Sequence, residues 1–201
     1  MKILPDWLKN GYLRVIDPDA NWLVRRGVHP NTITAIGTAC TVAGGIIYGF
    51  GHIRTGGWFL SMTALFDVLD GTVARRSNKS STFGAFLDST LDRFSDAALF
   101  LGLLAYYASL GAHYQEIVLL GAALTGSLAT SYARARAEGL GLKDEVGFFT
   151  RTERIILLAI GLLIGHWHSY AMVVVLWIIA VLSNLTALQR IYHVWRQTGG
   201  K

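Results

Sequence analysis

The sequence predicts an all-α integral membrane protein with six transmembrane helices preceded by an N-terminal amphipathic juxtamembrane helix. Three observations lead to this prediction. Of 201 residues, 52% are hydrophobic and only 15% are charged, with a mean hydropathy of +0.41, whereas a soluble domain carries about 25% charged residues. The apolar residues gather in long, nearly uncharged stretches, and the positive charges gather at one side of the helices that these stretches predict.

Six apolar stretches mark the predicted spans, and they run over 31–50, 56–66, 97–112, 117–133, 155–165 and 169–188. Several approach the roughly 20 residues that cross a bilayer core, and the shorter ones reach that length when their polar ends are included. No linker or break in composition divides the chain. We therefore expect one domain over 1–201, with an interfacial region over 1–28 and a six-helix bundle over 29–196.

The N-terminus is too charged for a signal peptide, because lysines, arginines and aspartates interrupt any apolar core there. Ile3, Leu4, Trp7 and Leu8 instead recur at helical spacing, which predicts a helix lying along the membrane surface. The single cysteine, Cys40, lies in the first span and is expected to be a packing residue, since apolar surroundings suppress the thiolate.

The distribution of Lys and Arg predicts the orientation in the membrane. With six spans, both termini, the 2–3 loop and the 4–5 loop share one side, and of the 18 basic residues only Arg54 falls on the other. Because Lys and Arg accumulate in cytoplasmic loops, we expect a multi-pass protein of the cell (plasma or inner) membrane with both termini in the cytoplasm. The net charge of +5 is therefore a topology signal, and nucleic-acid binding is not expected.

Four aspartates at the inner ends of the second and third spans are the candidate chemical groups. Asp67 and Asp70 are three residues apart, and Asp88 and Asp92 are four apart, so each pair projects from one helical face. The short connection 76–83 predicts that the two helices are antiparallel neighbours whose pairs face each other. Crowded carboxylates need protons or a cation, and oxygen-only ligands suit Mg²⁺, Mn²⁺ or Ca²⁺. The alternative is a structural ion-pair network with the arginines of this segment, Arg75, Arg76 and Arg93.

Residues 67–92 resemble the signature of the CDP-alcohol phosphotransferase (CDP-alcohol phosphatidyltransferase) family at every fixed position, D-x2-D-G-x2-A-R-x8-G-x3-D-x3-D. The resemblance implies a six-helix membrane fold, usually a homodimer, with a polar active site open to the cytoplasm. It also implies that the four aspartates bind Mg²⁺, or Mn²⁺, as two ions per site. In the family, the residue that matches Asp92 is the general base.

The same resemblance implies a set of contacts to the CDP-lipid: Asn31, Thr32, Ile33, Thr34, Asp67, Gly71, Ala74, Arg75 and Ser81. The chemistry of these residues agrees with that role. A nucleotide can approach the helix backbone closely at a residue without a β-carbon such as Gly71, and Ala74 keeps the same groove open. The Arg75 guanidinium can bind phosphate oxygens as a fork. Ser81 stands where many members have Thr, so the hydroxyl is kept.

A second basic cluster lies at the cytoplasmic ends of the last three spans and includes Arg134, Arg154 and Arg190. It can be a pocket for the phosphate of an acceptor or a rim that contacts anionic lipid. A free alcohol would not need so many cations. Residues 131–138, 147–154 and 189–190 resemble bacterial phosphatidylinositol phosphate synthases, in which the matching basic residues bind inositol phosphate. Arg134 departs from them by replacing a common lysine, so the donor geometry differs there.

Together, these resemblances imply a metal-dependent enzyme of phospholipid synthesis. The expected reaction moves a phosphatidyl group from CDP-diacylglycerol to inositol 1-phosphate, giving phosphatidylinositol phosphate and CMP. The protein is expected to contact membrane lipid, in which CDP-diacylglycerol is dissolved. One alternative is the same chemistry on glycerol 3-phosphate, and a more distant one is a divalent-cation transporter, since intramembrane aspartates also line ion pathways. Asp96, one turn past Asp92, could support the site or pair with Arg93.

Overall fold

The computed structural model describes residues 17–77, 81–144, 146–164 and 169–199, and all regular elements in these ranges are α-helices. A helix over 17–25 is followed by α2 (Pro30–Gly49), α3 (Ile53–Ser77), α4 (Thr82–Leu110), α5 (Tyr114–Gly139), α6 (Arg151–Ile164) and α7 (Ser169–Gln197). The all-α prediction is therefore confirmed. The predicted surface helix around Ile3 and Trp7 lies outside the described residues.

The helix starts on the charged side of the bundle have local causes. Pro30 occupies the first turn of α2, where its missing N–H costs nothing, and the His29 ring accepts a hydrogen bond from the Asn31 amide. The Ser81 hydroxyl caps α4 by accepting from the Gly84 amide at 3.0 Å. At α6, the Glu153 carboxylate accepts from the Thr150 amide at 2.8 Å. Each cap fixes the helix end that carries candidate site residues.

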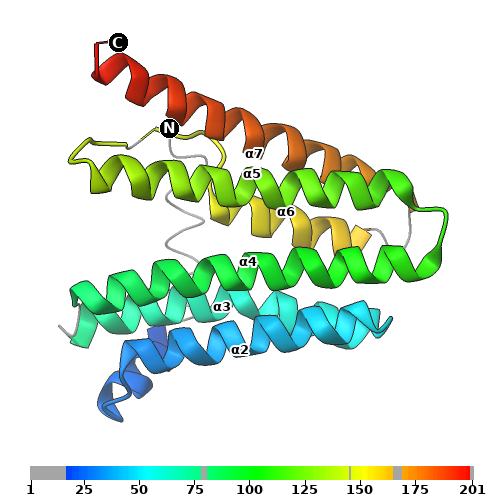
Figure 1. The fold of residues 1–201 in the computed structure, drawn as a ribbon. Helices are drawn as coiled ribbons and strands as arrows, with labels where there is room; N and C mark the ends of the chain where they lie inside the picture. The colour runs from blue at the N-terminus through cyan, green and yellow to red at the C-terminus, as the bar shows by residue number, and fades with distance from the viewer. Residues whose placement is uncertain (1–16, 78–80, 145, 165–168, 200–201) are drawn as a thin grey trace.

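The six long helices run back and forth and bring one end of each to the same side of the molecule (Figure 1). Extensive contacts follow the order α3, α2, α4, α5, α7, α6, and a smaller contact between α6 and α3 closes the ring. Among the described residues, α3 and α4 each make their most extensive contacts with α2. The expected direct pairing of α3 with α4 stays a prediction.

Small residues let α2 pack closely on both α3 and α4. A β-carbon at Gly45 would lie 2.4 Å from the carbonyl oxygen of Ala98, and one at Gly102 would lie 2.2 Å from the carbonyl oxygen of Gly45. Toward α3, a β-carbon at Gly37 would lie 2.7 Å from that of Phe66. Backbones can approach this closely only where the side chains are absent. The glycines therefore hold α2 against both neighbours.

Within the described ranges, three helices are long and apolar enough to cross a membrane: α2, α5 and the Tyr170–Gln197 part of α7. Their outward faces carry large apolar side chains, as on α7, where Trp177, Leu185 and Leu188 are exposed. Such a surface is expected where lipid and not water surrounds the protein. The larger buried apolar cluster joins α4, α5, α6 and α7 and includes Leu103, Leu120, Leu176 and Ile179. The six-span topology itself stays a prediction.

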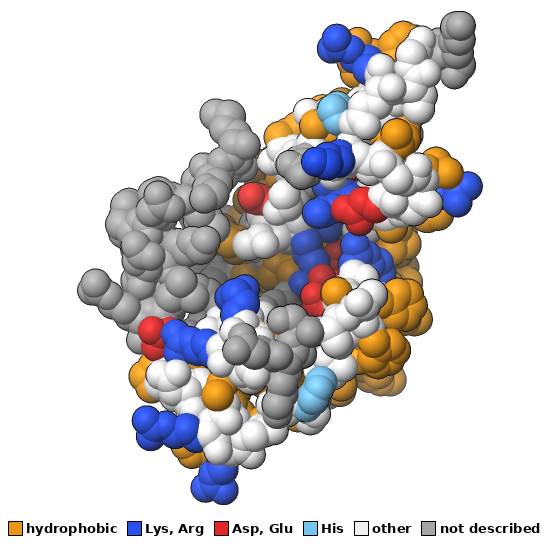
Figure 2. Space-filling model, turned by 90° about the vertical axis from the view of Figure 1, so that its left-hand side faces the viewer, with side chains coloured by type: hydrophobic (Ala, Val, Ile, Leu, Met, Phe, Trp, Pro, Cys, Tyr) orange, Lys and Arg blue, Asp and Glu red, His pale blue; other side chains and the backbone are white. Residues whose placement is uncertain are grey.

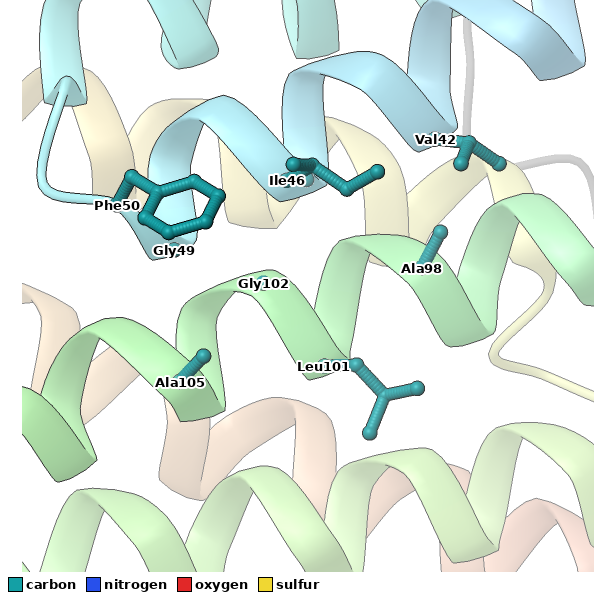
Figure 3. Close-up of a pocket in the computed structure, with 9 residues that line it drawn as sticks. Val42, Ile46, Gly49, Phe50, Ala98, Leu101, Gly102 and Ala105 are labelled. Carbon is teal, nitrogen blue, oxygen red and sulfur yellow. The ribbon is translucent and has the colours of Figure 1, made fainter.

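A cavity of about 520 Å³ lies over the α2–α4 contact (Figure 3). Its lining residues, which include Val42, Ile46, Phe50, Ala98 and Leu101, are all apolar or glycine. Ile46, Phe50 and Leu101 are also exposed to the surroundings. A space without a polar or ionisable side chain offers nothing for phosphate chemistry, so the candidate site must be sought elsewhere.

Candidate active site at the charged end of the bundle

Charged side chains of both signs gather around a hollow at the end of the bundle where α2, α4 and α6 begin (Figure 2). The other helix ends on this side are those of α3, α5 and α7 (Figure 1). This is the end to which the sequence assigns both aspartate pairs and the acceptor arginines. We describe the site in two parts, the nucleotide region (residues 31–34, 67–75 and 81–92) and the acceptor region (Asp96, Asp144, Arg151, Arg154 and Arg190).

Asp70 is the best-supported carboxylate of the nucleotide region. It is buried in α3, and the Thr34 hydroxyl on α2 donates a hydrogen bond of 2.7 Å to its Oδ2 atom. Ile33, beside Thr34, packs with Leu69 and Val73 in a small apolar cluster. This packing sets the register of α2 against α3, so the hydroxyl meets the carboxylate. A predicted nucleotide contact and a predicted metal ligand are thus in contact with each other.

Gly71 and Arg75 form the expected groove on α3. A β-carbon at Gly71 would lie 3.5 Å from Nη1 of Arg75, so the arginine side chain lies over the glycine. Arg75 is otherwise exposed and donates to the Thr72 hydroxyl at 3.3 Å. An exposed guanidinium above a bare backbone position can meet a phosphate group from solution. Ala74, the other small residue of the signature, is half-buried.

The first turns of α2 and α4 lie next to each other. A β-carbon at Gly84 would lie 3.0 Å from the side-chain oxygen of Asn31 and 3.1 Å from the Ser81 hydroxyl oxygen. These three residues therefore share one small patch, while Thr32 in the same turn of α2 is exposed. The expected nucleotide contacts of α2 and α4 are thus adjacent in space, although about 50 residues separate them in sequence.

Asp88 and Asp92 lie on α4 at different depths. Asp88 is exposed, whereas Asp92 is half-buried and forms an ion pair of 2.9 Å with Nη1 of Arg151, the first residue of α6. Asp67, the fourth aspartate of the signature, lies in α3, but its side chain is outside the described part. Among the side chains that are described, no three carboxylate, imidazole or thiol groups gather to hold a metal ion. The donor types fit Mg²⁺ or Mn²⁺, since Asp70, Asp88 and Asp92 offer oxygen alone.

Asp96 connects α4 to the acceptor region. Its carboxylate accepts from Arg151 at 3.0 Å, from Arg154 at 3.3 Å and from the Ser127 hydroxyl on α5 at 2.8 Å. The pairing with Arg93 that the sequence left open is not the one observed, because the Arg93 guanidinium donates to the backbone carbonyl of Ser89 on its own helix. Asp96 therefore supports the site by joining α4, α5 and α6.

Arg154 and Arg190 are both buried, at 3% and 6% exposure, which is unusual for arginine. Nε and Nη1 of Arg154 have no hydrogen-bond partner among the described residues. Arg190 donates to the backbone carbonyl of Thr130 at 3.1 Å, and Arg154, Arg134, Glu138 and Asp144 are its charged neighbours. The guanidinium groups of α6 and α7 thus lie near enough to influence each other electrostatically.

Arg134, the third expected acceptor residue, differs from the other two. Its side chain is half exposed and pairs with Glu138 one turn further along α5, at 2.8 Å. An exposed pair of this kind holds its members weakly. Arg134 is therefore exposed to the surroundings, while Arg154 and Arg190 are enclosed by the protein.

Sequence reasoning missed Arg151 as a partner of the aspartates and Asp144 altogether. Arg151 and Arg154 are three apart on α6, and Asp92 and Asp96 are four apart on α4, so both pairs of like charge occupy one helical face. That matched spacing was a usable signal. Asp144 lies in an irregular connection with no periodicity to read, and only the structure shows that it is buried beside Arg190.

Comparison with known proteins agrees with the resemblance that the motif suggested. The family model described as CDP-alcohol phosphatidyltransferase matches residues 27–185. A phosphatidylinositol phosphate synthase of Mycobacterium tuberculosis is 35% identical over 204 aligned residues, covering 99% of this chain and 94% of that protein. The matched part includes both the nucleotide and the acceptor regions.

Two crystal structures of the Mycobacterium tuberculosis phosphatidylinositol phosphate synthase are similar to this fold. One has CDP-DAG bound; it superposes with a TM-score of 0.81 at 35% identity, covering 90% of this chain and 94% of that one. The other is a complex with manganese and citrate, with a TM-score of 0.80 at 35% identity over 89% and 88% of the two chains. The apolar helices and this likeness together indicate a membrane-embedded protein.

Proposed function

The chain belongs to the CDP-alcohol phosphatidyltransferase family, and from that premise we propose that it transfers the phosphatidyl group of CDP-diacylglycerol to inositol 1-phosphate. The hydroxyl oxygen of the acceptor attacks the phosphorus that carries the diacylglycerol. The bond from that phosphorus to the bridging oxygen of the pyrophosphate breaks, CMP leaves, and the hydroxyl proton passes to the enzyme. The products are phosphatidylinositol phosphate and CMP.

The observation that carries this proposal is the pair of buried arginines. Nε and Nη1 of Arg154 are buried donors without a hydrogen-bond partner among the described residues, and leaving such groups unpaired costs free energy. A doubly charged phosphate would satisfy them with charge-assisted hydrogen bonds. An unphosphorylated alcohol lacks the anionic oxygens that would accept these charge-assisted hydrogen bonds. The acceptor of this chain is therefore a phosphorylated alcohol, as the name of its Mycobacterium tuberculosis relative also suggests.

The nucleotide region would hold the CDP-lipid. Arg75, lying over Gly71, is placed to bind a phosphate of the pyrophosphate group. The patch of Asn31, Ser81 and Gly84 offers amide and hydroxyl groups beside a glycine, which suits the sugar and base of a nucleotide. The other expected contacts of α2, Thr32, Ile33 and Thr34, lie in the same turn. The crystal structure with CDP-DAG bound supports this assignment by its likeness of fold.

Asp67, Asp70, Asp88 and Asp92 would hold two Mg²⁺ or Mn²⁺ ions, and the manganese complex of the similar structure supports a divalent metal. Such ions polarise the pyrophosphate and offset the charge on departing CMP. The Thr34 hydroxyl fixes the orientation of Asp70, in the way that outer hydrogen bonds orient metal-binding carboxylates. Asp92 would take the proton of the attacking hydroxyl, and its ion pair with Arg151 holds it beside the acceptor region.

We further propose that the site lies at the cytoplasmic membrane face, with both termini on that side, because basic residues concentrate there. We also propose that the enzyme acts as a homodimer, as its family does. Cys40 is the only native cysteine, so single cysteines introduced near residues 79 and 167 in a Cys40→Ser background can report the orientation. Membrane-impermeant labelling of intact cells should modify position 167 and leave position 79 unmodified until the cells are opened.

The test of function is a panel of acceptors offered with CDP-diacylglycerol and Mg²⁺ to the purified protein in detergent. CMP release and a new phospholipid are expected with inositol 1-phosphate, and neither with free inositol. Asp17→Asn, a change at an exposed ion pair near α3, serves as a matched control and should behave as wild type. Turnover with glycerol 3-phosphate alone would replace the proposed acceptor, and no CMP release with any alcohol would reject the enzyme.

A further inference from the structure

Asp144 lies in the connection between α5 and α6 and is the most deeply buried carboxylate in the part of the chain that the structure describes. It is 1% exposed, against 6% for Asp70 and 7% for Asp96. Neither carboxylate oxygen has a hydrogen-bond partner among the described residues. Nε of Arg190 lies 3.9 Å from its Oδ2 atom. A buried carboxylate without hydrogen bonds is costly, and a nearby cation is what makes it tolerable.

Arg190 is enclosed from three directions. Its Nη1 atom donates to the Thr130 carbonyl of α5 at 3.1 Å, and its Nε atom faces Asp144. On the third side, a β-carbon at Gly147 would lie only 3.0 Å from Nη2 of Arg190, and Gly147 has a φ of +139°, which L side chains rarely adopt. Both the space and the backbone there require glycine. The guanidinium therefore has a single position, set by α5 and by the α5–α6 connection.

The α5–α6 connection is attached to α7 at a second point. The side-chain amide of Gln197 donates to the carbonyl of Lys143 at 2.6 Å. Gln197 is seven residues past Arg190, which puts both on the same face of α7. Residues 143 and 144 of the connection thus contact two positions of α7, Gln197 and Arg190, that are two helical turns apart. The connection is held in place independently of any substrate.

We infer that Asp144 is a positioning residue that fixes Arg190 for the phosphate of the acceptor. This inference rests on the proposed function. Asp144 would touch no substrate, since its side chain is fully enclosed. It holds the guanidinium by charge at 3.9 Å without forming a hydrogen bond to it. The N–H groups of Arg190 that face neither Thr130 nor Asp144 are then left for phosphate, and the enzyme selects phosphorylated acceptors through a residue outside the substrate contacts.

The experiment is a double-mutant cycle on Asp144 and Arg190, read as separate KM values for inositol 1-phosphate and CDP-diacylglycerol. Asp144→Asn keeps the shape and removes the charge, so we expect the acceptor KM to rise about tenfold, with the CDP-diacylglycerol KM unchanged. In the Arg190→Gln background, Asp144→Asn should add less than about twofold, because the residue it acts through is gone. Asp144→Glu should recover part of the loss. Lys143→Gln, an exposed change next in sequence, is the control and should match wild type.

The cycle separates this inference from the proposed function. If Arg190→Gln leaves the acceptor KM unchanged, the acceptor site itself is wrong. If Arg190→Gln raises it and Asp144→Asn does not, the proposed function stands and the role of Asp144 is rejected. If Asp144→Asn fails to fold, the Asp144→Asn/Arg190→Gln double variant tests the inference instead. It removes both charges, so neither is left buried without its partner. A double variant that folds supports the pairing, and one that also fails shows that Asp144 supports the chain independently of Arg190.

Discussion

The nucleotide region and the acceptor region place charge in opposite ways. In the nucleotide region the buried charge is the carboxylate Asp70, which a neutral hydroxyl supports. In the acceptor region, Arg154 and Arg190 are the buried cations of the described chain, and two carboxylates, Asp96 and Asp144, offset them. A region whose buried charge is negative is suited to cations, and one with buried guanidinium groups is suited to an anion. The nucleotide region is therefore suited to binding a metal and the pyrophosphate, and the acceptor region is suited to binding the acceptor phosphate.

Removal of the metal should have the largest effect, and it acts on the nucleotide region. We expect a chelator to abolish CMP release and Mg²⁺ or Mn²⁺ to restore it. Asp67→Asn and Asp70→Asn should each lose activity while the protein stays folded, as measured by its thermal melting in detergent, because each removes one charged ligand. Full turnover in excess chelator would show that the carboxylates of this region serve a purpose other than metal binding.

The next largest effect is expected at Asp92, where the two regions meet. Asp92→Asn keeps the shape and removes the proton acceptor, so kcat should fall by about 10² to 10⁴. Binding of CDP-diacylglycerol, measured by equilibrium titration, should be largely kept. The Asp17→Asn variant provides the comparison for general effects of losing a carboxylate at this end of the bundle. An Asp92→Asn enzyme within a few-fold of wild type would exclude Asp92 as the base.

In the acceptor region, we expect a substitution to raise the KM for inositol 1-phosphate and to leave the KM for CDP-diacylglycerol unchanged. Arg154→Gln removes charge-assisted hydrogen bonds to phosphate, each worth roughly 1.5 to 3 kcal/mol, so the KM for inositol 1-phosphate should rise about tenfold or more. Arg190→Gln should behave alike. Paired KM measurements for both substrates provide the check. If both KM values move together, or free inositol serves as well as its phosphate, the separation into two regions fails and the arginines form a rim that contacts lipid.

The smallest effect is expected at Arg134, which has the same charge but a different setting. Its side chain is half exposed and shared with Glu138, and exposed pairs contribute about 1 kcal/mol or less. Arg134→Gln should therefore raise the acceptor KM only a few-fold. The same assay as for Arg154→Gln measures it, preferably at two ionic strengths, since salt should reduce the difference further. An effect as large as that of Arg154→Gln would place Arg134 in direct contact with the acceptor.

The two regions also differ in how far the sequence predicted them. The nucleotide region follows from a continuous signature, because fixed spacing on a helix fixes the face on which Asp67, Asp70 and Gly71 lie. Even there, the signature does not predict that α2 packs closely on both α3 and α4, since that depends on close contacts at Gly37 and Gly45. Periodicity describes one helix at a time, whereas packing depends on pairs.

The acceptor region is assembled from distant segments, so its residues could be chosen by charge but their partners could not. Asp96 pairs with residues more than 50 positions away. The matched spacing of Arg151 and Arg154 is compatible with this arrangement, but it does not by itself exclude a pair with Arg93. Asp144 sits in an irregular connection, where no helical face predicts burial. The sequence also ranked Arg134 with Arg154 and Arg190, although only the latter two are buried.

The contact between Gly45 and Gly102 has a consequence for how the protein tolerates mutation. Either position would bring a single added methyl group within 2.4 Å of a backbone carbonyl oxygen of the opposite helix, and backbone cannot move aside as a flexible side chain does. Gly102 is ten residues from Asp92, about 15 Å along α4. A saturation scan of the chain should therefore find a second group of intolerant positions in the middle of the bundle, remote from substrate, where even alanine impairs turnover by separating α2 from α4.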